Sequence, residues 1–112
     1  MSQKDVRYAA LVALLAETLM TTAGDTSGEL RRAVKARAGG LGSIDVPETL
    51  VPLVEKIAHH AYRVTDADLE ALKQAGYSED AIFELTLSAA LGAGLLRLER
   101  GLSALRGDGG LT

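Results

Sequence analysis

The sequence predicts an all-α fold, and three observations support that prediction. The 18 alanines and 19 leucines supply a third of the 112 residues, and both residue types favour helices over strands. Aromatic residues, which stabilise sheets through cross-strand pairs, make up only 4% of the chain. Only two prolines, Pro47 and Pro52, interrupt it. We therefore expect a single domain of about five to six helices over residues 1–112.

The N-terminal part, residues 1–44, predicts two helices and a glycine-rich loop. The first helix runs from about Lys4 to Met20, and residues 9–16 are apolar on every side, which is typical of a helix sandwiched between neighbours. The second is a short basic helix from Glu29 to Ala38. We expect its basic side chains to face solvent, with contact to an acidic partner as the alternative. Glycines at positions 39, 40 and 42 end this part of the chain.

A helical core is expected over residues 45–105, and its first helix begins near Pro47. Asp45 can cap the first helix of this core, and Glu48 follows three residues later, as in a capping box. Pro47 would lie in the first turn, where its missing N–H costs nothing. The helix is expected to end at about Tyr62, before a short break at residues 64–65.

Two more helices follow, and their ends are marked by local signals. Thr65 and Asp68 form a capping box for a short helix that ends near Ala75, and Gly76 is a natural left-handed stop. Ser78 is expected to cap the last helix.

The last helix is expected over residues 79–105, followed by a flexible tail at 106–112. Six of the seven residues from Ser88 to Gly94 are small. Because each glycine in a helix interior costs about 1 kcal/mol relative to alanine, we expect another helix to approach closely here. That helix can belong to this chain or to another subunit.

Composition excludes several function classes. The chain has no cysteine, which excludes disulfides, thiolate nucleophiles and sulfur-ligated metal sites. The net charge of −3 gives no general attraction to nucleic acid or to anionic membranes. Asp5 interrupts the basic N-terminus and Glu17 closes the apolar run, so we expect no signal peptide. No apolar run approaches the ~20 residues of a membrane span, and we expect a cytoplasmic protein.

The segments 60–72 (HAYRVTDADLEAL) and 75–85 (AGYSEDAIFEL) resemble the carboxymuconolactone decarboxylase and alkylhydroperoxidase-like (AhpD-like) superfamily. In that family a short helix ends at an Ala–Gly turn, and an acidic cap opens a long helix that contains alanine and glycine. The resemblance covers about residues 45–105. It implies an AhpD-like helical bundle that assembles as a trimer or hexamer, with pockets between helices.

The chain departs from the family's redox motif. Redox members carry Cys-x-x-Cys-x-x-x-His before this turn, and alignment on Gly76 places those positions at Ala61, Val64 and Asp68. The missing thiols exclude peroxidase chemistry. Members that decarboxylate a lactone use acid–base groups, and the resemblance therefore implies acid–base lyase chemistry on a small anionic molecule. No cofactor and no metal are expected.

His59 and His60 are the two histidines and the candidate bases. They lie about 100° apart on a helix, so they cannot both face one pocket. Glu55 lies four residues before His59, on the same face, and can orient it. Tyr62 or Asp66 would complete this acid–base pair. The alternative is that one histidine faces solvent and the other lies at an interface, near a helix C-terminus.

Three other charged residues are candidates for the same site. Arg63 can hold an anionic substrate as a bidentate fork, or cap carbonyls at a helix end. Asp68 occupies the position of the family's histidine, although its capping role explains it fully. Glu84, among apolar neighbours, would be a general acid with a raised pKa if buried, or else face solvent or pair with an arginine. Tyr62, Arg63 and Asp68 are the candidate substrate-binding residues.

Three other functions compete with acid–base catalysis: a metal site, DNA binding and a non-catalytic assembly role. A metal site from Glu55, His59 and Asp66 or Asp68 lacks motif spacing. A helix-turn-helix over residues 65–84 would carry six acids against the single base Lys73, so phosphates would repel it. A non-catalytic interaction or assembly subunit with a vestigial pocket remains the main alternative to an enzyme.

Overall fold

The computed structural model describes residues 3–41 and 44–107, without the side chains at positions 5, 8 and 9. These residues form five α-helices: α1 (Gln3–Thr21), α2 (Gly28–Ala38), α3 (Val51–His60), α4 (Asp66–Gln74) and α5 (Glu79–Arg106). Two 3-10 turns, η1 (Glu48–Leu50) and η2 (Ala61–Arg63), flank α3. No strand occurs among the described residues, which confirms the all-α prediction.

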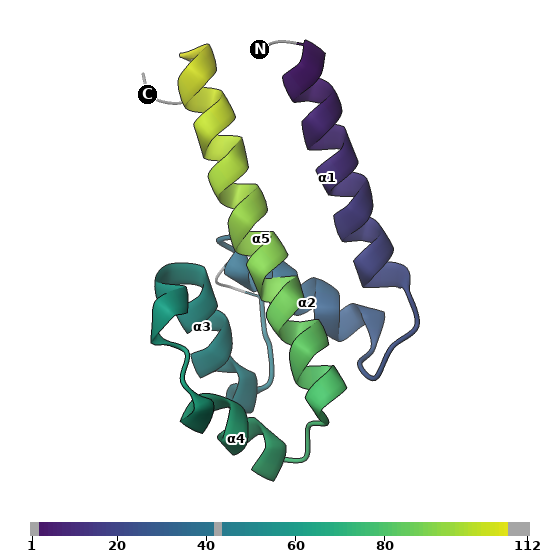
Figure 1. Cartoon of the computed structure of the whole chain (residues 1–112), viewed down its shortest axis with the longest axis vertical. Helices are drawn as coiled ribbons and strands as arrows, with labels where there is room; N and C mark the ends of the chain where they lie inside the picture. The colour runs from purple at the N-terminus through teal and green to yellow at the C-terminus, as the bar shows by residue number, and fades with distance from the viewer. Residues whose placement is uncertain (1–2, 42–43, 108–112) are drawn as a thin grey trace.

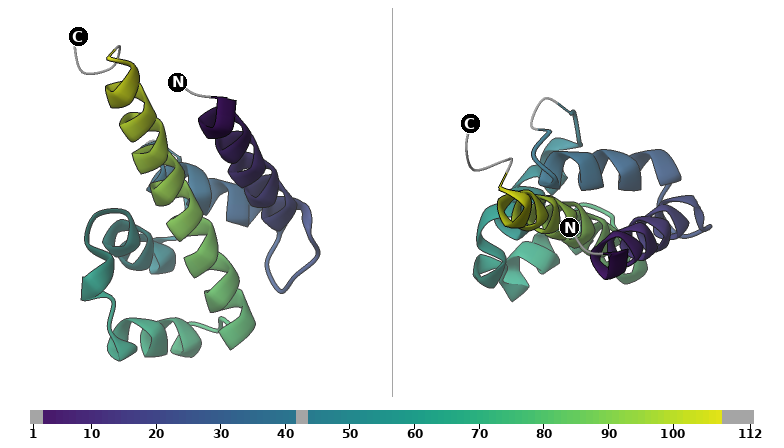
Figure 2. Two further views of the ribbon diagram at one scale, coloured as in Figure 1. Left: turned by 45° about the horizontal axis from the view of Figure 1, so that its top comes forward. Right: turned by 90° about the horizontal axis from the view of Figure 1, so that it is seen from above.

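The long helix α5 is the centre of the fold, and each of the other four α-helices contacts it. Figure 1 shows α5 running the length of the molecule, with α1 antiparallel beside it and α4 at its foot. The view from above in Figure 2 places α2 and α1 on different sides of α5. The N-terminus of α1 and the C-terminus of α5 extend together beyond the other helices.

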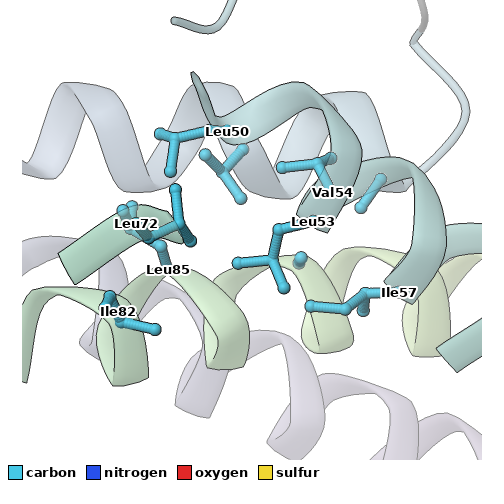
Figure 3. Close-up of a cluster of buried hydrophobic side chains, with 10 residues drawn as sticks. Leu50, Leu53, Val54, Ile57, Leu72, Ile82 and Leu85 are labelled. Carbon is cyan, nitrogen blue, oxygen red and sulfur yellow. The ribbon is translucent and has the colours of Figure 1, made fainter. Parts of the chain in front are cut away.

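The hydrophobic core lies where α2, α3 and α4 meet the first half of α5. Figure 3 shows Leu50, Leu53, Val54 and Ile57 directed at Leu72, Ile82 and Leu85, and all seven side chains are at most 6% exposed. Val34, Ala38 and Ala89 complete this cluster. Because these residues come from four helices, the cluster joins both halves of the chain.

The expectation that α1 is sandwiched between neighbours is wrong for the described chain. Among the described side chains of α1, only Ala16 and Met20 are buried, whereas Leu11, Leu14 and Leu15 are 52–63% exposed. The reason is geometric: α1 packs through the face that holds Ala16 and Met20, and these three leucines lie on its other face.

The start of α3 also differs from the expectation. Asp45 caps no helix; Pro47 instead precedes the 3-10 turn η1, and Leu50, which has no side-chain cap, precedes α3. Pro52, rather than Pro47, lies in the first turn of α3. The extended backbone of Pro47 (φ −52°, ψ 139°) keeps it outside the helix. At its other end α3 stops at His60, and η2 covers residues 61–63.

The ends of α4 and α5 are as the sequence predicts. The Thr65 hydroxyl accepts a hydrogen bond from the Asp68 backbone N–H, and the Asp68 carboxylate accepts one from the Thr65 N–H. Gly76 has φ +104°, which favours glycine. Ser78 caps α5 by accepting from the Ala81 N–H at 3.0 Å. Arg106, expected in a flexible tail over 106–112, belongs to α5 instead; residues 108–112, like 42–43, lie outside the described residues.

By length and composition alone, α5 could cross a membrane, which the sequence analysis did not anticipate. The core helix of a soluble protein passes the same test, and 39% of the apolar window of α5 is buried inside the fold. This measure therefore does not distinguish a membrane span from a core helix.

Candidate functional site

The Glu55–His59 pair forms as its spacing predicts. Both residues lie on α3, one turn apart, and His59 Nε2 is 3.4 Å from Glu55 Oε2. The other oxygen of Glu55 accepts a hydrogen bond from Arg37 Nε of α2 at 3.0 Å. Arg37 also donates to the Ile44 carbonyl at 3.3 Å. Arg37 thus holds one oxygen of Glu55, and the other oxygen can orient the imidazole.

This pair opens onto a cavity of about 390 Å³ between α2, α3 and α5, which we call the basic pocket. Its size lies within the usual range of small-molecule sites. It is lined by Arg37, Ala38, Gly40, Glu55, Ala58, His59, Ala93, Leu96, Arg97 and Arg100. Three guanidinium groups and one carboxylate are among these side chains. The pocket is therefore positive in a chain whose net charge is −3.

Arg97 links α5 to the end of α3. Its Nη2 donates to the Ala58 carbonyl at 2.8 Å, next to His59 in sequence. Carbonyls in the last turn of a helix carry partial negative charge, so a guanidinium is favoured there. This contact holds the C-terminal end of α3, and with it His59, against α5.

Tyr62, Arg63 and His60 gather outside the basic pocket, which corrects the expected site. The rings of His60 and Tyr62 meet edge to face with centroids 5.9 Å apart, and the Arg63 guanidinium lies 5.7 Å from the Tyr62 ring centroid. Tyr62 is 79% exposed. Neither Tyr62 nor Asp66 lines the basic pocket, so neither completes the Glu55–His59 pair. Both histidines are exposed in this chain.

Asp68 serves the structure of α4. Besides its part in the capping box, its carboxylate accepts hydrogen bonds from Lys56 Nζ of α3 at 2.8 and 2.9 Å. The Lys56 hydrogen bonds, followed by those from Thr65, lower the pKa of Asp68. The capping explanation given by the sequence is confirmed, and Lys56 is its tertiary partner.

Glu84 binds a loop instead of acting as a buried acid. It accepts hydrogen bonds from the backbone N–H groups of Asp25 and Thr26 at 2.8 and 2.9 Å, and from the Thr26 hydroxyl at 2.6 Å. The Thr26 hydroxyl, more than the backbone N–H groups and the charge of Arg31, lowers the pKa of Glu84 against the opposing effect of burial. Glu84 is only partly buried, so the condition for a raised pKa is not met. Three donors aimed at one carboxylate stabilise its charged form.

The basic helix α2 is less solvated than the sequence suggested. Arg31 is 4% exposed and donates to the carbonyls of Leu19 and Thr22, which joins α2 to the end of α1. Arg32 pairs with Glu17 of α1. Only the tertiary structure reveals these partners, because they lie 9 to 15 residues away in the chain.

Sequence reasoning missed the cationic side of the basic pocket. The basic helix that contains Arg37 is expected to face solvent, and the sequence by itself gives Arg97 and Arg100 no place in a site. The spacing of Arg97 and Arg100 places them on one side of α5, but nothing local indicates that Arg37 lies across from them. Among the described residues, no three histidine, aspartate or glutamate side chains are grouped to hold a metal ion, so Glu55, His59 and Asp66 or Asp68 do not form such a site.

Comparisons with known proteins identify no relative of this chain. The chain matches no family model, and no curated protein or solved structure matches it at a significant level.

Proposed function

We propose that the protein is a cysteine-free, carboxymuconolactone decarboxylase-like protein that binds a small anionic molecule in the basic pocket. The observation that carries this proposal is that the Glu55–His59 pair opens onto the same cavity as three guanidinium groups. An anion held by Arg97 and Arg100 would lie beside an oriented imidazole. The family resemblance adds a homo-oligomer, a trimer or hexamer, and the cytoplasm stays the proposed location.

In this proposal His59 is the acid–base group. The Glu55 carboxylate near Nε2 favours a proton on that nitrogen, which leaves Nδ1 free to take up a proton. In a decarboxylation the bond to the substrate carboxylate breaks, CO₂ leaves, and the electron pair passes into a neighbouring carbonyl group. The imidazolium, which has taken its proton from solvent, then gives that proton to the carbon that lost CO₂, and water protonates the imidazole again. Glu55 is a positioning residue, and Arg37 fixes Glu55.

The test is a titration of the full chain with succinate, a small dicarboxylate, followed by ¹H–¹⁵N NMR and calorimetry. We expect saturable binding with shifts confined to residues around the basic pocket. Arg100→Gln should weaken binding about tenfold, because a charge-assisted hydrogen bond contributes roughly 1.5–3 kcal/mol. Arg63→Gln is the matched control, since Arg63 is an exposed arginine outside the pocket. Equal affinities for these two variants would contradict the proposal.

The rate of a decarboxylation tests the acid–base role of His59. Oxaloacetate is a dicarboxylate that loses CO₂ to give pyruvate, and we expect the chain to accelerate this reaction. His59→Gln should abolish the acceleration and keep succinate binding, whereas His60→Gln should keep both. Equal effects of the two substitutions on the rate would show that His59 is not the acid–base group.

The second candidate function is a non-catalytic assembly subunit, and the exposed leucines of α1 favour it. Large exposed apolar surfaces commonly mark protein contacts. This function predicts that succinate binds to no part of the chain. The titration with succinate therefore separates the two candidates.

A further inference from the structure

A second cavity, of about 490 Å³, lies between α4 and the start of α5, and we call it the acidic groove. Its apolar lining comes from Val64, Leu69, Ile82 and Phe83. Phe83 is 65% exposed, whereas Ile82 beside it belongs to the hydrophobic core. The groove therefore extends the core to the surface and leaves apolar area open to a partner.

Carboxylates surround this apolar lining. Asp66 and Glu70 lie one turn apart on α4, and Glu79 lies on the α5 side. Lys73 is the one base among the residues that line the groove, and it pairs with Glu79 at 2.9 Å. Neither Asp66 nor Glu70 forms an ion pair with a described residue. Because like charges one turn apart destabilise a helix, the groove favours a cationic occupant.

The exposed side of α1 has the complementary chemistry. Lys4, Arg7, Leu11 and Leu14 recur every three or four positions and share one face with Leu15, and we call these five residues the outer face of α1. The leucines are 52–63% exposed, and both bases are exposed as well. Neither base forms an ion pair with a described residue. The outer face of α1 is thus apolar along most of its length and basic at its start.

The two surfaces lie at opposite ends of one molecule. Figure 1 shows α4 at the foot of α5, whereas the first turns of α1 extend beyond the other helices at the far end. A contact between them therefore requires two chains. We propose that the outer face of α1 docks in the acidic groove of a second copy of this chain. This inference rests on the homo-oligomer of the proposed function and names the contact that forms it.

Charge complementarity is the first argument for a second copy. In the docked pair, Lys4 and Arg7 of one chain neutralise Asp66 and Glu70 of the next, and the leucines of α1 cover the lining beside Phe83. One turn separates the two bases and one turn separates the two acids, so both pairs can form together. Each chain gives one outer face and receives another. Such a heterologous contact closes a ring when the rotation between chains permits it, as in a trimer.

The exposed area of the chain is the second argument. A compact monomer of 11.7 kDa exposes about 5,900 Å², whereas this chain exposes 7142 Å². Its radius of gyration is 15.2 Å, against about 13 Å for a compact domain of 112 residues. The excess area of roughly 1,200 Å² matches the total area of a small specific interface. In a ring each chain buries one outer face and one groove, which together form one such interface.

Charge reversal tests this contact by light scattering of the full chain at micromolar protein. The unmodified chain should have a multiple of 11.7 kDa. The face variant, Lys4→Glu with Arg7→Glu, should have the mass of one chain, because it brings acids to an acidic groove. The groove variant, Asp66→Lys with Glu70→Lys, should do the same. Arg63→Glu and Glu29→Lys are the controls, since both residues are exposed and lie outside the two surfaces.

An equal mixture of the face variant and the groove variant tests which surfaces meet. Each variant keeps one unmodified surface, and in the mixture every outer face meets a groove of opposite charge on the other variant. The mass should therefore rise to a multiple of one chain again, although neither variant associates alone. Circular dichroism of each variant checks that both are folded. Folded variants that stay monomeric in the mixture would overturn the proposal.

The other outcomes separate this contact from the proposed function. An oligomer whose mass the face variant leaves unchanged would place the contact elsewhere and keep the homo-oligomer. A monomeric unmodified chain would overturn both, whereas binding of succinate in the basic pocket can occur with or without them. A monomer that binds phosphatidylcholine–phosphatidylglycerol vesicles, and loses this binding in the face variant, would assign the outer face of α1 to an anionic membrane and overturn the proposal.

Discussion

Gly92 of α5 lies directly against the backbone of Lys35 in α2, and a Cβ atom on residue 92 would overlap the Lys35 carbonyl oxygen. That Cβ would also lie 3.1 Å from the Lys35 Cα. The small residues in the middle of α5 thus have two different surroundings. Gly92 is required by a neighbouring helix of the same chain, whereas Gly94 faces open space.

We predict that Gly92→Ala lowers the free energy of unfolding by about 2 kcal/mol or more, although alanine favours a helix. A backbone carbonyl cannot move aside as a flexible side chain can, so α2 and α5 must separate. Chemical denaturation followed by circular dichroism measures this loss.

Gly94→Ala is the matched control for Gly92→Ala. It should raise the free energy of unfolding by roughly 1 kcal/mol through helix propensity alone. Both variants should be measured at a protein concentration low enough to keep the chain monomeric, because association adds to apparent stability. A loss of similar size in both variants would show that the contact with Lys35 does not set the cost.

Arg31→Met should destabilise the fold by about 2–4 kcal/mol. The buried guanidinium donates to the carbonyls of Leu19 and Thr22, and its removal leaves two acceptors without that donor. Arg32→Met is the control, because its ion pair with Glu17 is about half exposed and screened by solvent, and its loss should change stability much less. Thermal unfolding of both variants tests the prediction, and similar losses would contradict it.

Glu84 should make stability depend on pH in the acidic range. Its pKa in the folded chain is lowered from 4.5, first by the Thr26 hydroxyl. A carboxyl group with a lowered folded pKa stabilises the fold above its unfolded pKa, and this contribution is lost as the pH falls through the folded pKa. The wild-type chain should therefore lose stability below about pH 4.5 more steeply than Glu84→Gln.

The comparison with Glu84→Gln isolates this one group. The pKa values of Glu17, Asp68 and Glu79 are also lowered in the folded chain, and these groups titrate in the same way in both proteins. Free energies of unfolding measured between pH 7 and pH 3 give the difference. Parallel curves over that range would show that the loop does not hold Glu84 as the structure indicates.

Thr65→Ala should lower stability by about 1 kcal/mol, through the loss of the N-cap of α4. Asp68→Asn should also lower it, because the Lys56 ion pair and one side of the capping box are weakened. Neither variant should change binding of succinate, since neither residue lines the basic pocket. Weaker succinate binding in a fully folded Asp68→Asn chain would show that Asp68 takes part in ligand binding.

The features that could be predicted from the sequence are those set by residues close together in the chain. The signals at Thr65, Asp68, Gly76 and Ser78 act between residues at most four positions apart, and the structure confirms each of them. Glu55 and His59 were paired correctly for the same reason, since one helical turn fixes their spacing. The error at Asp45 is also local: Pro47 adopts an extended backbone, and the chain makes a 3-10 turn before α3 begins.

Tertiary packing alone decided which charged side chains meet. Glu84 meets its loop 58 residues away, Arg97 reaches α3 across 39 residues, and Arg37 meets Glu55 across 18. A charged side chain carries no sequence mark of a partner that far along the chain. Its environment depends on which helix faces it, and so does the direction of its pKa shift. The sequence by itself determined the helices and the local caps, whereas the packing of α2 and α3 on α5 decided which charges share a pocket.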